Sequence, residues 1–330
     1  MLACSSLVTI VKDEDSRIVQ FSHFSVKEFL TADRLAEPMR DVSRYHIELE
    51  AAHTILAQAC LGVLLQLDDR INWDNIEGCP LALYSAQYWP THARFGSVSS
   101  RIKDGMECLF DEDKPHFATW LWVYNDDGWS RDITTTRPEK PSSVPLYHAA
   151  RLGFRDLAAQ LIAEHPERIN AGDRKGFAPI HAAAIHGHID ILALLLEHGV
   201  DVDSRNSYDQ TPLSWAAVNG EVDVGQYLLD CGADINARND FHATPLYLAA
   251  RDGHVGFVRI LLERGARIDL PDNQGSTPLH QVEKIEVARL LLEHGADVNA
   301  RDNSGITPSQ VNWRQEFVEL LSMYGAESLK

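Results

Sequence analysis

The sequence predicts a mostly α-helical protein whose second half is a solenoid of six stacked repeats. Two observations carry this prediction. A proline recurs at intervals of 34, 33, 33, 33 and 30 residues from Pro145 to Pro308, and in most units an Ala-rich run and then a Leu-rich run with helical spacing follow it. With 330 residues, the chain is long enough for about two domains with substantial cores.

Each repeat unit begins with a signal for a helix start. In units three to six a threonine precedes the proline, as in Thr211-Pro212; threonine favours the N-cap and proline fits the first helical position. The alanine pairs that follow make this helix thin enough for close stacking. A Leu-rich second helix ends at a glycine suited to the left-handed conformation, and an extended finger follows. The expected terminating glycines are Gly199, Gly232, Gly265, Gly295 and Gly325.

These units resemble the ankyrin repeat, which has a period of about 33 residues and carries Thr-Pro-Leu-His at the start of its first helix. The pattern is complete in unit five, where Thr277-Pro278 precedes Leu279-His280. The resemblance implies an ankyrin-repeat solenoid of six units over residues 144–330, in which neighbouring units cover one another's apolar faces. The expected units are 144–176, 177–209, 210–242, 243–275, 276–305 and 306–330.

The last two units are shorter than the first four. The distance from the proline to the end of the Leu-rich run is 17 residues in units one to four, 14 in unit five and 13 in unit six. Unit five also has Gln281-Val282 where other units have two alanines. We expect a shortened first helix and an altered concave surface in unit five, and a polar C-terminal cap in unit six.

The first 125 residues carry a different pattern. Two strand-like runs, 7–11 and 18–21, flank a charged turn and precede a helix start with Ser25 as N-cap and Glu28 completing a capping box. This β-hairpin and the sequence of residues 22–30 resemble the end of the winged-helix region in STAND-type NTPases of the NACHT class. Combined with the repeats downstream, the chain resembles the NACHT–ankyrin proteins of filamentous fungi.

This second resemblance implies a winged-helix remnant and a helical linker domain over residues 1–125, with a linker at 126–143. Helices are expected at 51–65, 81–89 and 117–124. It also implies the sensor arm of a recognition protein, with a possible upstream NACHT domain. Because no Gly-x-x-x-x-Gly-Lys-Ser/Thr run occurs in the sequence, we assign no nucleotide-binding residue, no cofactor and no catalytic activity. The alternative is a fragment of a nucleotide-dependent switch whose P-loop domain lies outside this chain.

The charge distribution argues against binding to nucleic acid or to a membrane surface. The net charge is −18: 14 basic and 22 acidic residues precede Val144, and 16 basic and 26 acidic residues follow from there. Phosphate-rich partners require clustered Lys and Arg, so a winged-helix DNA-binding function is disfavoured. The five cysteines form no CxxC pair, and no secretory leader or membrane-spanning run is apparent, so we expect a cytoplasmic protein.

The fifteen histidines raise the question of a metal site, and His186 and His188 form the tightest cluster. We expect hydrogen-bonding roles instead, because His188 and His254 follow the glycine between the two helices of a repeat. His181 and His280 occupy the repeat's own histidine position. A nucleophilic role for His23 beside Ser22 and Ser25 is disfavoured for want of an orienting acid.

Partner binding is therefore the expected function, at the finger tips and the exposed ends of the first helices. The residues that fall at these positions are Arg174, Lys175, Phe177, Ile185, His186, Ser207, Tyr208, Gln210, Val218, Asn219, Asp240, Phe241, Ala243, Arg251, Asp252, Asn273, Gln274 and Ser276. Phe177, Tyr208 and Phe241 are expected to form a ladder of aromatic rings on successive fingers, a composition typical of binding hot spots. The alternative is that each ring packs on its own hairpin.

Overall fold

A computed structural model describes residues 8–13, 16–21, 49–67, 80–124, 143–311 and 314–326. The chain divides into two compact units, one formed by residues 1–109 and 119–137 and the other by 110–118 and 138–330. The expected helix start at Ser25 and nearly all of the expected linker lie outside the described residues.

The first unit contains a two-stranded sheet and a helical pair. Strands β1 (Val8–Asp13) and β2 (Ser16–Phe21) are antiparallel, with Val8 opposite Phe21. Helices α2 (Leu49–Leu64) and α4 (Pro80–Ala93) pack against each other, and the short α5 (Val98–Arg101) contacts both. Helices α6 (Lys103–Phe110) and α7 (Pro115–Tyr124) complete the helical part. The three helices expected from the sequence in this region are confirmed in α2, α4 and α7.

Tryptophan side chains form the core of the first unit. Trp89 on α4 and Trp120 on α7 are fully buried, with their rings edge to face at 5.7 Å between centroids. The Trp120 Nε1–H donates a hydrogen bond of 3.0 Å to the carbonyl of Ala86, which fixes α7 on α4.

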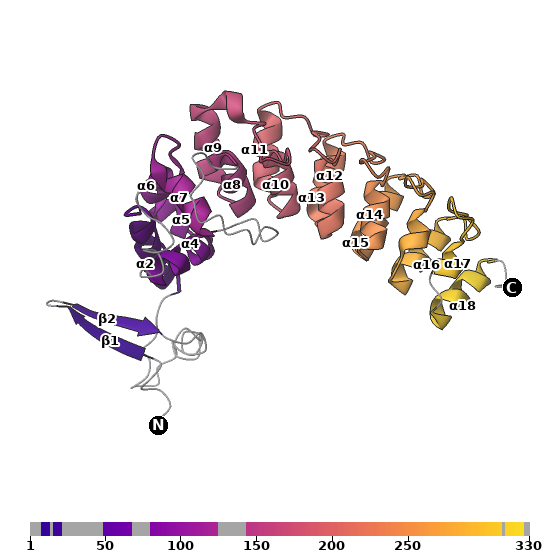
Figure 1. The fold of residues 1–330 in the computed structure, drawn as a ribbon, viewed down its shortest axis with the longest axis horizontal. Coiled ribbons are helices and arrows are strands. Elements are labelled where there is room, and N and C mark those ends of the chain that lie inside the picture. The colour runs from indigo at the N-terminus through magenta and orange to yellow at the C-terminus, as the bar shows by residue number, and fades with distance from the viewer. Residues whose placement is uncertain are drawn as a thin grey trace, which may run out of the picture. The chain divides into compact units, whose positions relative to one another are not determined.

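The second unit is a single file of six helix pairs, which run from magenta to yellow in Figure 1. The first helices are α8 (Pro145–Leu152), α10 (Pro179–Ile185), α12 (Pro212–Asn219), α14 (Pro245–Arg251), the 3₁₀ turn η4 (Pro278–Gln281) and α17 (Pro308–Val311). The second helices are α9 (Arg155–Glu164), α11 (Ile189–Glu197), α13 (Val222–Asp230), α15 (Val255–Glu263), α16 (Ile285–Glu293) and α18 (Gln315–Met323), with a 3₁₀ turn η3 (Pro166–Arg168) after α9.

Local sequence sets the ends of these helices as expected. The Thr211 and Thr244 hydroxyls accept hydrogen bonds from the backbone N–H groups of Ser214 and Tyr247, so both threonines are N-caps. Each of the five terminating glycines has φ between 82° and 91°, a left-handed conformation that costs glycine little. The shortened first helix expected in unit five is confirmed, since η4 contains four residues; α17 in unit six also contains four residues.

Stacking of neighbouring repeats buries small residues in the first helices and large aliphatic residues in the second. Ala216 and Ala217 on α12 are fully buried, as are Leu192 and Leu195 on α11. At Gly225 on α13, an added Cβ would lie 2.5 Å from the ring of Phe257 on α15, which is fully buried. Glycine is therefore required at this point, because the next repeat packs directly onto the helix backbone.

Histidines connect successive repeats through backbone carbonyls. His181 Nδ1 accepts the N–H of Ala178 at 3.2 Å. Its Nε2 donates to the carbonyl of Ser204 at 2.9 Å and to the carbonyl of Gln210, in the next repeat, at 3.1 Å. His280 repeats this arrangement with Ile306.

The histidine after the inter-helix glycine bonds in the opposite direction along the chain. His188 donates to Arg151 at 3.2 Å and His254 to Val218 at 2.9 Å, both in the preceding repeat. The expected hydrogen-bonding roles of these histidines are confirmed, and among the described residues no cluster of three or more His, Cys, Asp or Glu side chains could hold a metal ion.

Replacing Gly225 with alanine is expected to lower the free energy of unfolding by about 1–3 kcal/mol, because the new Cβ displaces the Phe257 ring. Urea denaturation of the full chain measures the change. Gly62→Ala on α2 is the matched control: nothing lies within 4 Å of its added Cβ, so this variant is expected to gain up to about 1 kcal/mol from helix propensity. Equal effects of the two variants would contradict the packing explanation.

Acidification is expected to destabilise the second unit through its buried histidines. Burial lowers the pKa of His148 to about 3 and also lowers the pKa of His181. Between pH 6.5 and pH 3, His148 binds a proton in the unfolded chain but not in the folded chain. Acid therefore favours unfolding, and the stability that is present above pH 6.5 is lost as the pH falls toward 3.

Denaturant titrations between pH 7.5 and 5 measure this loss. The variant His148→Gln is expected to show a shallower dependence on pH than the wild type, and Gln226→Ala, at an exposed position of α13, an unchanged one. A His148→Gln profile parallel to that of the wild type would contradict this explanation.

Candidate protein-binding surface

Five fingers project between the helix pairs of the second unit, and each closes in the same way. We define them as finger two (residues 173–178), finger three (206–211), finger four (239–244), finger five (272–277) and finger six (302–307). The first residue of each finger is Asp or Asn, and its Oδ1 accepts the backbone N–H groups two and four residues later at 2.8–3.0 Å. These first residues are Asp173, Asn206, Asn239, Asp272 and Asp302.

Neighbouring fingers are joined by a ladder of backbone hydrogen bonds. In each step the second residue of one finger donates its N–H to the carbonyl of the third residue of the preceding finger. The four bonds run from Ser207 to Lys175, Asp240 to Tyr208, Asn273 to Phe241 and Asn303 to Gln274, at 2.9–3.2 Å. We call the third residue of a finger its tip residue. In fingers two to five the backbone carbonyl of the tip residue is bonded by the next finger, whereas its side chain is exposed to solvent.

Fingers three and four differ from the others in backbone conformation. Their fourth residues, Asp209 and His242, have φ of 57° and 59°. In fingers two, five and six this left-handed position holds a glycine, with φ between 73° and 81°. The left-handed conformation raises the conformational free energy of Asp and His, whereas glycine adopts it without this cost.

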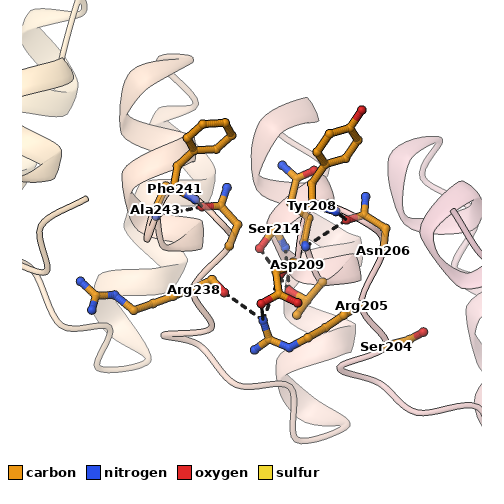
Figure 2. Close-up of polar contacts among 12 residues, drawn as sticks. Ser204, Arg205, Asn206, Tyr208, Asp209, Ser214, Arg238, Phe241 and Ala243 are labelled. Atoms are coloured by element: carbon orange, nitrogen blue, oxygen red, sulfur yellow. Dashed lines mark hydrogen bonds and ion pairs between the residues drawn. The ribbon is translucent and has the colours of Figure 1, made fainter. Parts of the chain in front are cut away.

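Arginines at the bases of fingers three and four connect successive fingers (Figure 2). Arg205 Nη1 donates to the carbonyl of Asp209 in its own finger at 3.0 Å and to the carbonyl of Arg238 at 2.9 Å. Arg238 in turn donates to the carbonyl of Pro271 in the following repeat. Arg205 thus holds the turn of finger three, and the bases of fingers three, four and five are linked in succession.

A family model described as ankyrin repeats (3 copies) matches residues 146–239 and 237–302. These residues form ankyrin repeats. The crystal structure of the ankyrin repeat domain of Bcl-3, a member of the IkappaB protein family, superposes with a TM-score of 0.51 at 28% sequence identity, covering 56% of this chain and 87% of that one.

Two curated relatives also match. The azaphilone pigments biosynthesis cluster protein L of Monascus ruber is 30% identical over 212 residues, which are 58% of this chain and 44% of the relative. Alpha-latrocrustotoxin-Lt1a of Latrodectus tredecimguttatus is 36% identical over 52 residues, 16% of this chain and 4% of the toxin. The matched region therefore spans less than half the length of either relative.

The aromatic ladder expected on the ankyrin fingers holds for two rings, and the expectation for Phe177 is wrong. Tyr208 and Phe241 are the tips of fingers three and four, with 41% and 61% of their surfaces exposed. Phe177 follows the left-handed Gly176 and so lies two positions later in finger two. It turns inward and is half-buried, with its ring centroid 5.1 Å from that of Trp215 on α12.

The other predicted positions fall into two groups. Arg174, Lys175, His186, Ser207, Asn219, Asp240, Arg251, Asn273 and Gln274 are exposed, whereas Ile185, Gln210, Val218 and Asp252 are half-buried and Ala243 and Ser276 are buried. Arg251 forms a bidentate pair with its neighbour Asp252, both bonds 2.9 Å long. In fingers two to five the fifth and sixth residues thus pack inward, and the second and third face solvent.

Sequence reasoning missed the bracing arginines. Arg205 and Arg238 are 33 residues apart, each directly before the first residue of a finger. This spacing, equal to the repeat period, is a signal in the sequence that could have identified them.

Carboxylates at the inner ends of the ankyrin fingers also connect repeats. The Asp203 carboxylate accepts the N–H of Asp234 at 3.1 Å, and Asp269 accepts the N–H of Asp297 at 3.2 Å. At the same position of the intervening repeat, the neutral Asn236 accepts the N–H of Arg267 at 2.9 Å. Burial raises the pKa of both Asp203 and Asp269, so each negative charge is disfavoured in the folded state.

The substitution Asp203→Asn is expected to preserve this bond, as Asn236 does, and to raise the free energy of unfolding at pH 7 by up to about 1 kcal/mol. Because the pKa of Asp203 is raised on folding, the cost of its charge exists above that pKa and disappears as the pH falls toward 3.8. Denaturation at pH 7 and pH 4 tests both statements. A lower stability than wild type at pH 7 would show that the charge strengthens the link.

Proposed function

We propose that this chain binds a protein partner through the exposed face of its ankyrin fingers, with fingers three and four at the centre. The observation that carries the proposal is the pair of aromatic tips, Tyr208 and Phe241, exposed on turns that the hydrogen-bond ladder and the arginines hold rigid. Neither ring has a ring contact within the described part of the chain. Exposed aromatic side chains on a preorganised backbone are typical of binding hot spots.

The chemistry of the described residues supports binding rather than catalysis. The titratable groups of the second unit with altered pKa values include His148, His181, Asp203, Asp269 and Tyr247. The first four are explained by burial within or between repeats. Tyr247, whose hydroxyl donates to the carboxylate of Asp272 at 2.7 Å, connects helix α14 to finger five.

We further propose that the chain is the sensor arm of a NACHT- or STAND-like recognition protein. The support is the resemblance of residues 22–30 to the end of a winged-helix region and the 212-residue similarity to a protein of the fungus Monascus ruber. The alternative proposal is that the chain is a fragment of a nucleotide-dependent switch whose P-loop domain lies outside this chain. Both place the partner-binding surface on the ankyrin fingers.

Among the described residues, no helix is both long and apolar enough to cross a lipid bilayer.

The double variant Tyr208→Ala/Phe241→Ala is expected to lose the protein that the full wild-type chain captures from a lysate, because it removes both exposed rings. Affinity capture with quantitative mass spectrometry measures the loss. The matched control is Gln226→Ala/Arg259→Ala, at exposed positions of α13 and α15, and it is expected to retain the partner. Equal recovery with all three baits would contradict the finger surface as the binding site.

Stability measurements accompany this test. The double variant is expected to unfold within about 0.5 kcal/mol of the wild type, because both side chains are largely exposed. Phe177→Ala is expected to lose about 1–3 kcal/mol, since its ring packs on Trp215. A large loss of unfolding free energy in the double variant would show that Tyr208 and Phe241 stabilise the fold.

A further inference from the structure

We infer that fingers three and four recognise an arginine-bearing, cationic segment of the partner protein. This inference rests on the proposed function and names the chemistry of the partner. It is carried by three observations: two exposed aromatic rings, the placement of negative charge around them, and the different chemistry of the fingers on either side.

The two rings present faces that suit a guanidinium group. Figure 2 shows the side chains of Tyr208 and Phe241 projecting to the same side of their fingers. The backbone bond from Asp240 to Tyr208, 3.2 Å long, makes the two tips neighbours. A planar guanidinium stacks on an aromatic face and is attracted by the negative charge of its π system, more favourably than a strongly hydrated ammonium group.

Negative charge is concentrated in the same part of the solenoid. Residues 177–242, which form units two and three, contain two basic and ten acidic residues, so they carry −8 of the −10 found from Val144 onward. The acidic residues are Asp190, Glu197, Asp201, Asp203, Asp209, Glu221, Asp223, Asp230, Asp234 and Asp240. A positively charged segment is attracted to this region over long range, which accelerates encounter.

Both basic residues of this region are already engaged in the scaffold. Arg205 bonds to the carbonyls of Asp209 and Arg238 and lies 3.6 Å from the Asp209 carboxylate, and Arg238 bonds to Pro271. Asp240 is exposed beside Phe241 and forms no ion pair within the described residues. An incoming arginine would therefore find a carboxylate next to an aromatic face.

The adjacent fingers limit the site to these two tips. Finger two exposes Arg174 and Lys175, which repel a cation, and finger five exposes the neutral amides of Asn273 and Gln274. A segment with arginines spaced to reach two neighbouring tips would therefore be attracted to fingers three and four and not to finger two.

Fluorescence anisotropy with the full chain and two labelled peptides, nona-arginine and nona-lysine, tests the inference. We expect the arginine peptide to bind more tightly than the lysine peptide. In Tyr208→Ala/Phe241→Ala the arginine peptide is expected to bind about tenfold more weakly, although the net charge is unchanged. Asp209→Asn/Asp240→Asn is also expected to weaken it, and asparagine tolerates the left-handed position of Asp209. The control Asn273→Ala/Gln274→Ala is expected to bind as the wild type does.

Three results would overturn the inference: no binding of nona-arginine to the wild type, equal affinity for the two peptides, or full affinity in the variant lacking the rings. The last would show attraction to net charge alone. These failures are distinguishable from failure of the proposed function. If the lysate capture still depends on Tyr208 and Phe241 while the peptide does not bind, the surface is correct and the partner chemistry is wrong; if neither assay depends on the rings, both are wrong.

Discussion

The second unit depends on contact between neighbouring repeats, because no repeat can bury its apolar faces alone. Close approach comes from small residues, as where Gly225 leaves room for the Phe257 ring. Polar bonds then fix the relative position of the repeats: His181 and His280 reach the following finger, whereas His188 and His254 reach back to the preceding first helix. Both ring nitrogens of the buried His181 are matched to backbone groups, and burial lowers its pKa, so the folded chain favours its neutral ring.

This arrangement separates the residues that hold the fold from those that can bind. In fingers two to five, the first residue closes the turn, the fifth and sixth pack inward, and the backbone of the second and third joins the ladder. The side chains of the second and third residues of these fingers face solvent. Tyr208 and Phe241 occupy such positions, and each is followed by a non-glycine residue in a left-handed conformation, Asp209 and His242, whose backbone N–H donates to the first residue of its own finger. The cost of that conformation is sustained because stacking fixes the finger from both sides.

Most of the fold could be predicted because its signals are local and repeat with the period. Thr-Pro pairs, alanine pairs and terminating glycines each specify a helix end or a close contact within their own unit, and a deletion in units five and six shortens the first helix to four residues in both. The site was predicted less well. Phe177 lies two residues before Pro179, whereas Tyr208 and Phe241 lie four residues before Pro212 and Pro245, so its counterparts in the repeat are the inward-packed Gln210 and Ala243. Grouping Phe177 with the two tip residues overlooked this difference in phase. The bracing by Arg205 is invisible from one repeat, since its acceptor, the carbonyl of Arg238, belongs to the next.

The sequence by itself determined the helical class, the six-unit periodicity, the capping of the helices and the acidic character of units two and three, because these depend on neighbouring residues or on composition alone. The tertiary structure decided which finger side chains are exposed, which arginines are committed to the backbone, and which carboxylates are partly buried between repeats. These depend on atoms brought together from units some 33 residues apart. A contact of that kind is set by how closely two repeats stack, and that distance is fixed only when both have folded.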